Sequence, residues 1–276
     1  MSYWYELLNQ LPLDFLQFDF MKNALLSVIL VTPLFALLGC MVINNQLTFF
    51  SDAIGHSALT GIAIGTLCGL TDPLWAMALF ACVLTLVVCL LRQYSSASTD
   101  TIVGLVMAFA VALGVVILSR GGGFIKYSRY LIGDILTITP GEIFRLCVLL
   151  ALVLLLWLTL YNQLFLASMN RSLARSRGIN VWPVELVFSM AVALTVTLSI
   201  QWVGLLVINS MLILPAAAAR NMARNAVQYT WFAVLFGLLS GLAGLVSSYY
   251  WDTAAGATIV LYAMACYLVS LILRRS

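Results

Sequence analysis

Residues 49–65 read FFSDAIGHSALTGIAIG and contain His56, the only histidine in this chain of 276 residues. Asp52 stands four positions before His56, and Thr60 stands four positions after it. Residues at i and i+4 lie one above the other on a helix, so these three side chains would form one polar stripe. The stretch therefore predicts a helix that carries an adjacent carboxylate and imidazole.

A second stripe on the same stretch consists of small residues. Ser57, Gly61, Gly65 and Gly69 recur at four-residue spacing, about 100° around the helix from the polar stripe. Small residues at this spacing let another helix approach closely within a bilayer. The sequence thus predicts that this helix packs tightly against a neighbour.

The composition excludes a soluble protein. The chain is 63% hydrophobic and 8% charged, whereas a soluble domain has about 25% charged residues. Its mean hydropathy is +1.08. The net charge of +3 comes from basic residues in short clusters between apolar runs. Such clusters are typical of signals that set membrane topology, whereas a nucleic-acid surface would need a contiguous basic face. Six cysteines are scattered through the apolar runs without a CxxC pair, which favours small buried hydrophobes over ligands or disulfides.

Apolar runs separated by short polar turns predict an all-α polytopic membrane protein with about nine transmembrane helices, eight at the least. We expect a single transmembrane domain over residues 1–276, with 1–19 as a surface segment and 124–142 as a short interfacial or re-entrant helix. Gln201 and Trp202 are expected to form a tight turn. The expected spans are 20–43, 52–70, 74–91, 101–118, 143–165, 182–200, 203–219, 228–248 and 256–273.

The most basic segment is 170–180, which reads NRSLARSRGIN. If this loop is cytoplasmic, eight of the 13 Lys and Arg residues lie on the same side, which places the N-terminus outside and the C-terminus inside. The pattern from Ser172 to Gly178 predicts a short helix with a cap and a glycine stop. A plain topology signal and a helix that docks on a partner explain this loop equally well.

Two interpretations of Asp52 and His56 compete. In the first, Ser51 caps the helix, Asp52 stabilises its positive end and His56 hydrogen-bonds to a neighbouring helix. In the second they bind a metal ion, because an ionisable group inside a span costs about 2.5–3.5 kcal/mol and is a functional candidate by default. An imidazole with a carboxylate suits divalent ions such as zinc or manganese.

The chain contains no phosphate-binding GxxxxGK[ST] motif, so a partner or an ion gradient must supply energy. A single histidine excludes a metalloprotease of the HExxH type. A gradient-driven carrier remains as the alternative, and it needs acidic groups deep in spans, for which Asp52 and Glu185 are the candidates.

Four stretches, in order, resemble the membrane permeases of ATP-binding-cassette importers for zinc, manganese and iron. They are SDAIGHS at 51–57 followed by Gly61-x-Ala63-x-Gly65, YLIGDIL at 130–136, GLLVI at 204–208 through LPAAAAR at 214–220, and GATIVL at 256–261. The resemblance spans about residues 20–273. One departure is DTAAG at 252–256, where the family often has Asp-x-Pro-x-Gly.

The resemblance implies a type II importer-like permease in the bacterial cytoplasmic (inner) membrane. Such a subunit is not an enzyme and binds no stable cofactor. It pairs with a second permease copy, here most simply as a homodimer, and works with separate ATPase subunits and an extracytoplasmic metal-binding protein. The transported ion would be divalent, with zinc ahead of manganese.

The resemblance also assigns residue roles. Asp52 and His56 match the metal-contacting pair of the family, and twofold symmetry would bring two carboxylates and two imidazoles to one ion. The loop 170–180 corresponds to the place where the ATPase couples. The expected contact residues are Arg171, Ser172, Leu173, Ala174, Arg175, Gly178 and Ile179.

Overall fold

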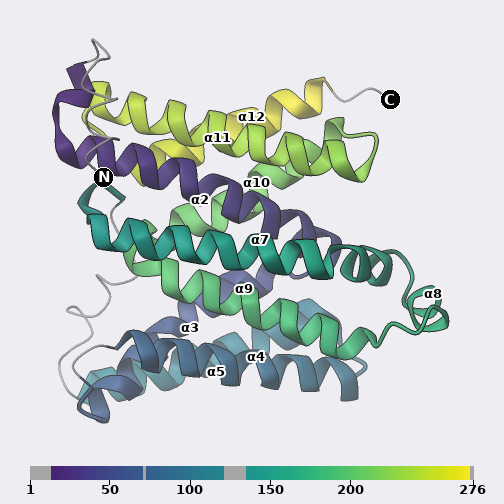
Figure 1. Ribbon diagram of the computed structural model, residues 1–276. Helices are drawn as coiled ribbons and strands as arrows, with labels where there is room; N and C mark the ends of the chain where they lie inside the picture. Colours follow the sequence, from purple (N-terminus) through teal and green to yellow (C-terminus); the bar gives the residue numbers. More distant parts are fainter. Residues whose placement is uncertain (1–13, 71–72, 121–134, 274–276) are drawn as a thin grey trace. The chain divides into compact units, whose positions relative to one another are not determined.

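A computed structural model describes residues 14–70, 73–120 and 135–273, and within these ranges all regular structure is helical (Figure 1). The two short 3-10 helices are η1 (Asp14–Gln17) and η2 (Ile135–Thr137). The α-helices are α2 (Asp19–Asn44), α3 (Thr48–Leu67), α4 (Leu74–Tyr94), α5 (Thr99–Arg120), α7 (Pro140–Met169), α8 (Arg171–Ser176), α9 (Val181–Val203), α10 (Leu205–Met222), α11 (Ala226–Trp251) and α12 (Ala255–Ile272).

Eight of these helices are long and apolar enough to cross a membrane, namely α2, α4, α5, α7, α9, α10, α11 and α12. The remaining long helix, α3, has 20 residues, but its serines, glycines, Asp52 and His56 make it less apolar than the other eight. The predicted all-α membrane fold is therefore confirmed. The nine expected spans correspond to the eight apolar helices together with α3.

Some predicted boundaries are wrong. α3 begins at Thr48, so Ser51 lies inside the helix, where its hydroxyl donates to the carbonyl of Thr48 at 3.0 Å, and it is not the cap. Gln201 and Trp202 are expected from the sequence to form a tight turn, but they belong to the last turn of α9. The helical conformation is interrupted at Gly204, whose φ of 88° favours glycine. Most of the expected surface segment 1–19 and of the helix 124–142 lies outside the described residues.

The helices group into two compact units, each built from discontinuous segments of the chain. Unit 1 comprises residues 1–40, 134–155 and 202–276, and unit 2 comprises 41–133 and 156–201. That the whole chain acts as one permease domain stays a prediction.

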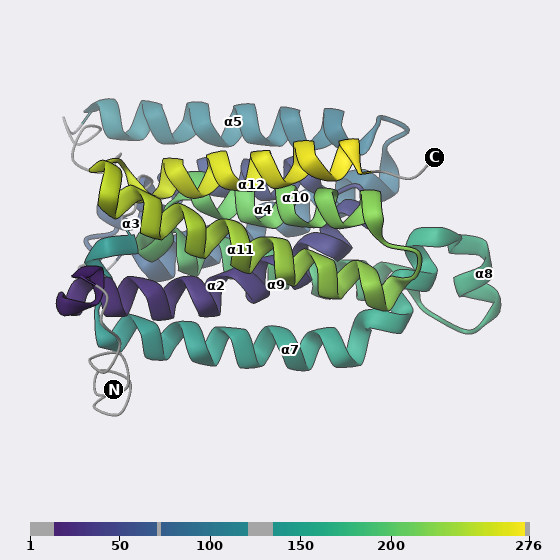
Figure 2. The ribbon, with the colours of Figure 1, turned by 90° about the horizontal axis from the view of Figure 1, so that it is seen from above.

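Unit 1 contains α10, α11 and α12, which pack on one another (Figure 2). A close approach is at Gly244 of α11, where a Cβ atom would lie 2.5 Å from the Cα of Ile259 of α12. Two polar bonds fasten α12 to its neighbours: Ser247 and Tyr262 share a hydrogen bond of 2.7 Å, and Asn221 donates to Ser270 at 2.9 Å. In a bilayer the hydrophobic effect does not drive helices together, so close packing of small residues and interhelical hydrogen bonds hold them in contact.

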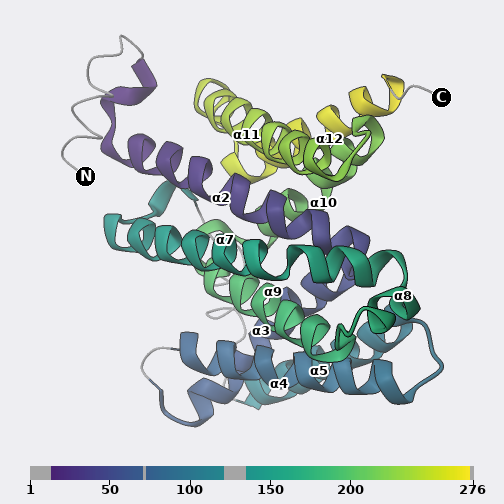
Figure 3. The ribbon, with the colours of Figure 1, turned by 45° about the vertical axis from the view of Figure 1, so that its right-hand side comes forward.

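Unit 2 is organised around α3, which packs against both α4 and α5 (Figure 3). Most α3 side chains are buried, so this helix is covered by two helices that are more apolar than it is. This arrangement positions the candidate site.

Candidate metal pathway on helix α3

The small-residue face of α3 contacts α4. A Cβ atom on Gly61 would lie 2.6 Å from the Cα of Met77, and one on Gly65 would lie 2.8 Å from the Cβ of Ala76. Ser57 is buried as well, at 1% exposure. Gly69 differs, because it follows the end of α3 with a φ of 70° and has open space where a Cβ would be. The close approach to α4 therefore involves Gly61 and Gly65, and Gly69 serves the turn.

Thr60 does not share a face with the two candidate ligands. It is fully buried against α5, where its hydroxyl donates to the carbonyl of Ala110 at 2.5 Å, and a Cβ on Gly114 would overlap its side chain. Four residues turn a helix by about 400°, so the direction drifts by about 40° at each step of the stripe. After two steps the side chain has rotated from the open face of α3 into its contact with α5.

Asp52 and His56 lie together on the open face of α3. The Nε2 atom of His56 is 3.5 Å from an Oδ1 atom of Asp52, and the two side chains are 44% and 39% exposed, respectively. Phe49, one turn before Asp52, is 62% exposed. The rest of α3 is mostly buried up to its last residue, Leu67, which is 71% exposed. Before that end of the helix, the exposed surface is concentrated on this pair and on Phe49.

This exposure has an energetic consequence in a membrane helix. A charged aspartate facing hydrocarbon would cost about 2.5–3.5 kcal/mol by insertion measurements. The open face of α3 is therefore suited to a water-filled path or to another protein surface. Among the described residues no group of three or more His, Cys, Asp or Glu side chains is arranged to hold a metal ion. This part of the chain supplies two ligands, which is fewer than a closed metal site has.

The loop 170–180 forms a short helix, as predicted, but with a different cap. The N-cap of α8 is Asn170, whose side chain accepts from the backbone N–H groups of Ser172 and Leu173. Gly178 follows the helix with a φ of 77°, the left-handed conformation that ends helices. These two residues explain why six residues are enough to make a defined helix.

One expected contact residue faces inward. Ala174 has no exposed surface and packs with Ala167 and Val181, against which Ile179 is partly buried. The methyl group of Ala174 therefore holds α8 to the ends of α7 and α9, and its expected contact with the ATPase stays a prediction. Leu173 is 45% exposed and is available to a partner.

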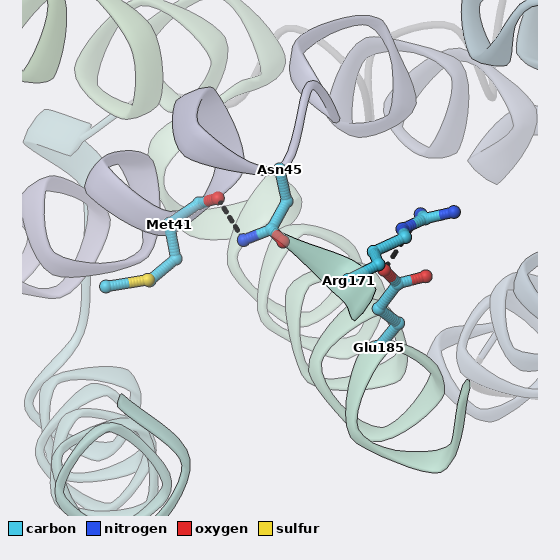
Figure 4. A network of polar contacts seen from close by, with 4 residues as sticks. All are labelled: Met41, Asn45, Arg171 and Glu185. Carbon is cyan, nitrogen blue, oxygen red and sulfur yellow. Dashed lines mark hydrogen bonds and ion pairs between the residues drawn. The ribbon is translucent and has the colours of Figure 1, made fainter. Parts of the chain in front are cut away.

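An ion pair joins α8 to α9 in unit 2, close to a polar contact at the end of α2 (Figure 4). Arg171 donates to Glu185 of α9 at 2.8 Å, and nearby Asn45 donates to the carbonyl of Met41 at 2.8 Å. Glu185 lies in the second turn of α9 and pairs with an arginine, so it is not a carboxylate deep within a span. This observation removes one of the two acidic groups on which the carrier alternative depends.

Sequence reasoning missed Asn45 and Arg92 as members of this region, and it missed the capping role of Asn170. Asn170 could have been recognised as a helix cap two residues before Ser172. Arg92 and Asn45 come from chain segments far from 170–180, and no local pattern links them to it.

Comparisons with known proteins agree with this architecture. The model of the ABC 3 transport family matches residues 17–274. The chain is 30% identical over 262 residues to the high-affinity zinc uptake system membrane protein ZnuB of Haemophilus influenzae, covering 93% of this chain and 98% of the relative. It is 26% identical over 255 residues to the manganese transport system membrane protein MntC of Listeria innocua, covering 92% and 91%.

A solved structure shows the same fold. PsaBC from Streptococcus pneumoniae in complex with Fab superposes with a TM-score of 0.78 at 27% identity, covering 98% of this chain and 95% of that one. Because the family match runs through nearly all of the multi-pass fold, this chain belongs to the ABC 3 transport family and is the membrane-spanning permease subunit of an ATP-binding-cassette transporter, separate from the subunit that hydrolyses ATP.

Proposed function

We propose that this permease carries zinc ions into the bacterial cytoplasm along a path lined by Asp52 and His56. The observation that carries the proposal is the half-exposed Asp52–His56 pair, with 3.5 Å between the two side chains, on a helix that is otherwise mostly buried. A polar pair held open on such a helix is suited to contact an ion in passage.

The chemistry of the pair supports a divalent transition metal. Imidazole and carboxylate are both common ligands of zinc, and manganese also accepts them. Two protein ligands bind an ion weakly enough for it to leave again, and transport requires this. A second permease copy related by twofold symmetry would supply another aspartate and another histidine, which completes a four-ligand shell without any further residue of this chain.

The choice of zinc over manganese rests on the relatives. The zinc uptake protein of Haemophilus influenzae is 30% identical to this chain, and the manganese transport protein of Listeria innocua is 26% identical. A probable iron transport system membrane protein of Haemophilus influenzae is 29% identical, so iron is a further candidate ion.

Deleting the gene and measuring cell-associated metals tests the substrate. We expect zinc content under chelation to fall severalfold in the deletion strain and to return when the gene is restored on a plasmid. Manganese and iron, measured by mass spectrometry in the same cells, should change little. A fall confined to manganese or iron would reassign the ion, and unchanged levels of all three would remove the metal-import proposal.

The proposed contact with the ATPase is the exposed side of α8. Leu173 projects from this helix on the side away from Arg171 and Arg175, since it stands two residues from each. Buried apolar contacts hold a complex together, whereas charges at its rim mainly tune association. Leu173 is therefore expected to be the anchor and Arg177 an accessory contact.

The substitution Leu173→Asp is expected to weaken ATPase binding at least tenfold, with thermal stability of the permease unchanged, because the side chain is exposed. Arg177→Ala should weaken it by less than threefold. Co-purification of the cognate ATPase with the detergent-solubilised permease measures both effects. Ala174→Asp should instead lower the thermal stability of the permease, because it buries a carboxylate against Ala167 and Val181. Normal ATPase recovery with Leu173→Asp would move the contact away from α8.

A further inference from the structure

A basic cavity of about 190 Å³ lies in unit 2 where α8 meets the ends of α4 and α9. Three arginines line it: Arg92 from the last turn of α4, and Arg171 and Arg175 from α8. Glu185 and Trp182 of α9 complete the wall together with the apolar residue Leu186. The metal pathway and the exposed side of α8 do not use this cavity.

The charges in the cavity are unbalanced. Glu185 is engaged by Arg171 at 2.8 Å. Arg92 and Arg175 form no ion pair with any of the residues that the structure describes. Three guanidinium groups therefore face one carboxylate in a partly enclosed space. Guanidinium groups present paired N–H donors that match the oxygens of a phosphate, so this cavity is suited to a phosphate anion.

The surroundings of the arginines are polar on one side and apolar on the other. A second cavity of about 330 Å³ shares Arg92, Arg171 and Glu185 and is otherwise lined largely by polar residues such as Asn45 and Thr99. The first cavity has Val181, Trp182 and Leu186 at its apolar wall. A phosphate held between them would have room for a polar head on one side and for hydrocarbon on the other.

The position along the helices fits the membrane surface. Arg92 stands near the C-terminal end of α4, and Trp182 is the second residue of α9, so the cavity lies where two predicted spans end. Tryptophan is enriched at membrane–water interfaces, and basic pockets at the ends of transmembrane helices bind anionic lipid headgroups. Free phosphate would use the arginines alike, but it would leave the apolar wall without a role.

We propose that Arg92, Arg171 and Arg175 bind the phosphate of an anionic phospholipid, whose hydrocarbon passes Trp182 and Leu186. Arg171 and Arg175 are one helical turn apart and share a face of α8, while Leu173 lies on the other side. The lipid would therefore hold α8 from one side and leave Leu173 free. This site does not depend on which ion the permease carries.

Native mass spectrometry of the full-length permease tests the site. The protein is purified in detergent and titrated separately with phosphatidylglycerol, phosphatidylcholine and inorganic phosphate. The variants are Arg92→Gln, Arg175→Gln and their combination, and the matched control is Arg177→Gln, a charge on the same loop that does not line the cavity. Arg92→Lys and thermal unfolding of every variant separate loss of binding from loss of fold.

We expect phosphatidylglycerol to bind at least tenfold more tightly than phosphatidylcholine. Each substitution of a cavity arginine by glutamine should weaken phosphatidylglycerol binding about fivefold, which corresponds to about 1 kcal/mol. The Arg177→Gln variant should bind phosphatidylglycerol as tightly as the wild type does. Arg92→Lys should lose less affinity for this lipid than Arg92→Gln does. Equal binding of both lipids, or wild-type binding by a folded double variant, would overturn the proposal. Displacement of the lipid by millimolar phosphate would show a free-phosphate site and would also overturn the proposal.

Discussion

The variants His56→Ala and Asp52→Ala are each expected to reduce metal uptake by at least about a hundredfold. Changes to residues that only orient a metal ligand cost about 10–100-fold, and these substitutions remove a ligand itself. Uptake of radioactive zinc by cells that depend on this permease measures the effect. The two variants should fail to about the same extent, because neither side chain binds an ion well alone.

The structure indicates that this loss would not come from misfolding. Both side chains are more than a third exposed, and the buried face of α3 consists of other residues, so their removal leaves that face in place. Membrane abundance and thermal unfolding should match the wild type. Ser51→Ala is the matched control, because Ser51 is adjacent to Asp52 but bonds within its own helix to Thr48. Wild-type uptake by a folded His56→Ala protein would remove α3 from the pathway.

The substitution Gly61→Leu is expected to abolish the folded permease. The first added carbon would already lie 2.6 Å from the Cα of Met77, so the backbones of α3 and α4 must separate before any side chain fits. Overpacking a well-packed core costs about 1–3 kcal/mol and more where the obstacle is backbone. Fluorescence-detected size-exclusion chromatography should show loss of the monodisperse peak, and Gly61→Ala should lower the melting temperature.

A glycine on a neighbouring helix provides the control. Gly104 of α5 has nothing within 4 Å of the position that a Cβ would occupy, so Gly104→Leu should fold normally. Leucine also has a higher helix propensity than glycine, so a loss of folding in Gly61→Leu would not come from a weakened helix. A stable and active Gly61→Leu permease would show that α3 and α4 do not approach as closely as this structure has them.

The number and approximate position of the long helices followed from the sequence. An apolar run of about 20 residues has one stable arrangement in a bilayer, because only a helix satisfies its own backbone hydrogen bonds there. The pairing of Asp52 with His56 was also predictable, since residues four apart on one helix are neighbours whatever surrounds them. The errors fell at ends, as with α3, which begins at Thr48 and places Ser51 inside the helix.

The directions of individual side chains were not predictable from the same spacing. Thr60 continues the polar stripe in the sequence, yet it faces α5 and bonds to Ala110. Ala174 lies in a short basic segment whose sequence suggests an exposed contact with a partner, yet it is fully buried against Ala167 and Val181. In both cases the neighbour that covers the residue comes from another helix, and a one-dimensional pattern does not contain that neighbour.

The sequence by itself therefore determined that this protein is a helical membrane protein with one carboxylate–imidazole pair, because both properties depend on hydropathy and local helix geometry. The tertiary structure alone decided which face of α3 stays open, and it alone gathered Arg92, Arg171 and Arg175 around one cavity. Those arrangements depend on which helices pack side by side. Contacts between residues distant in the chain set that choice, and no spacing within a single segment encodes it.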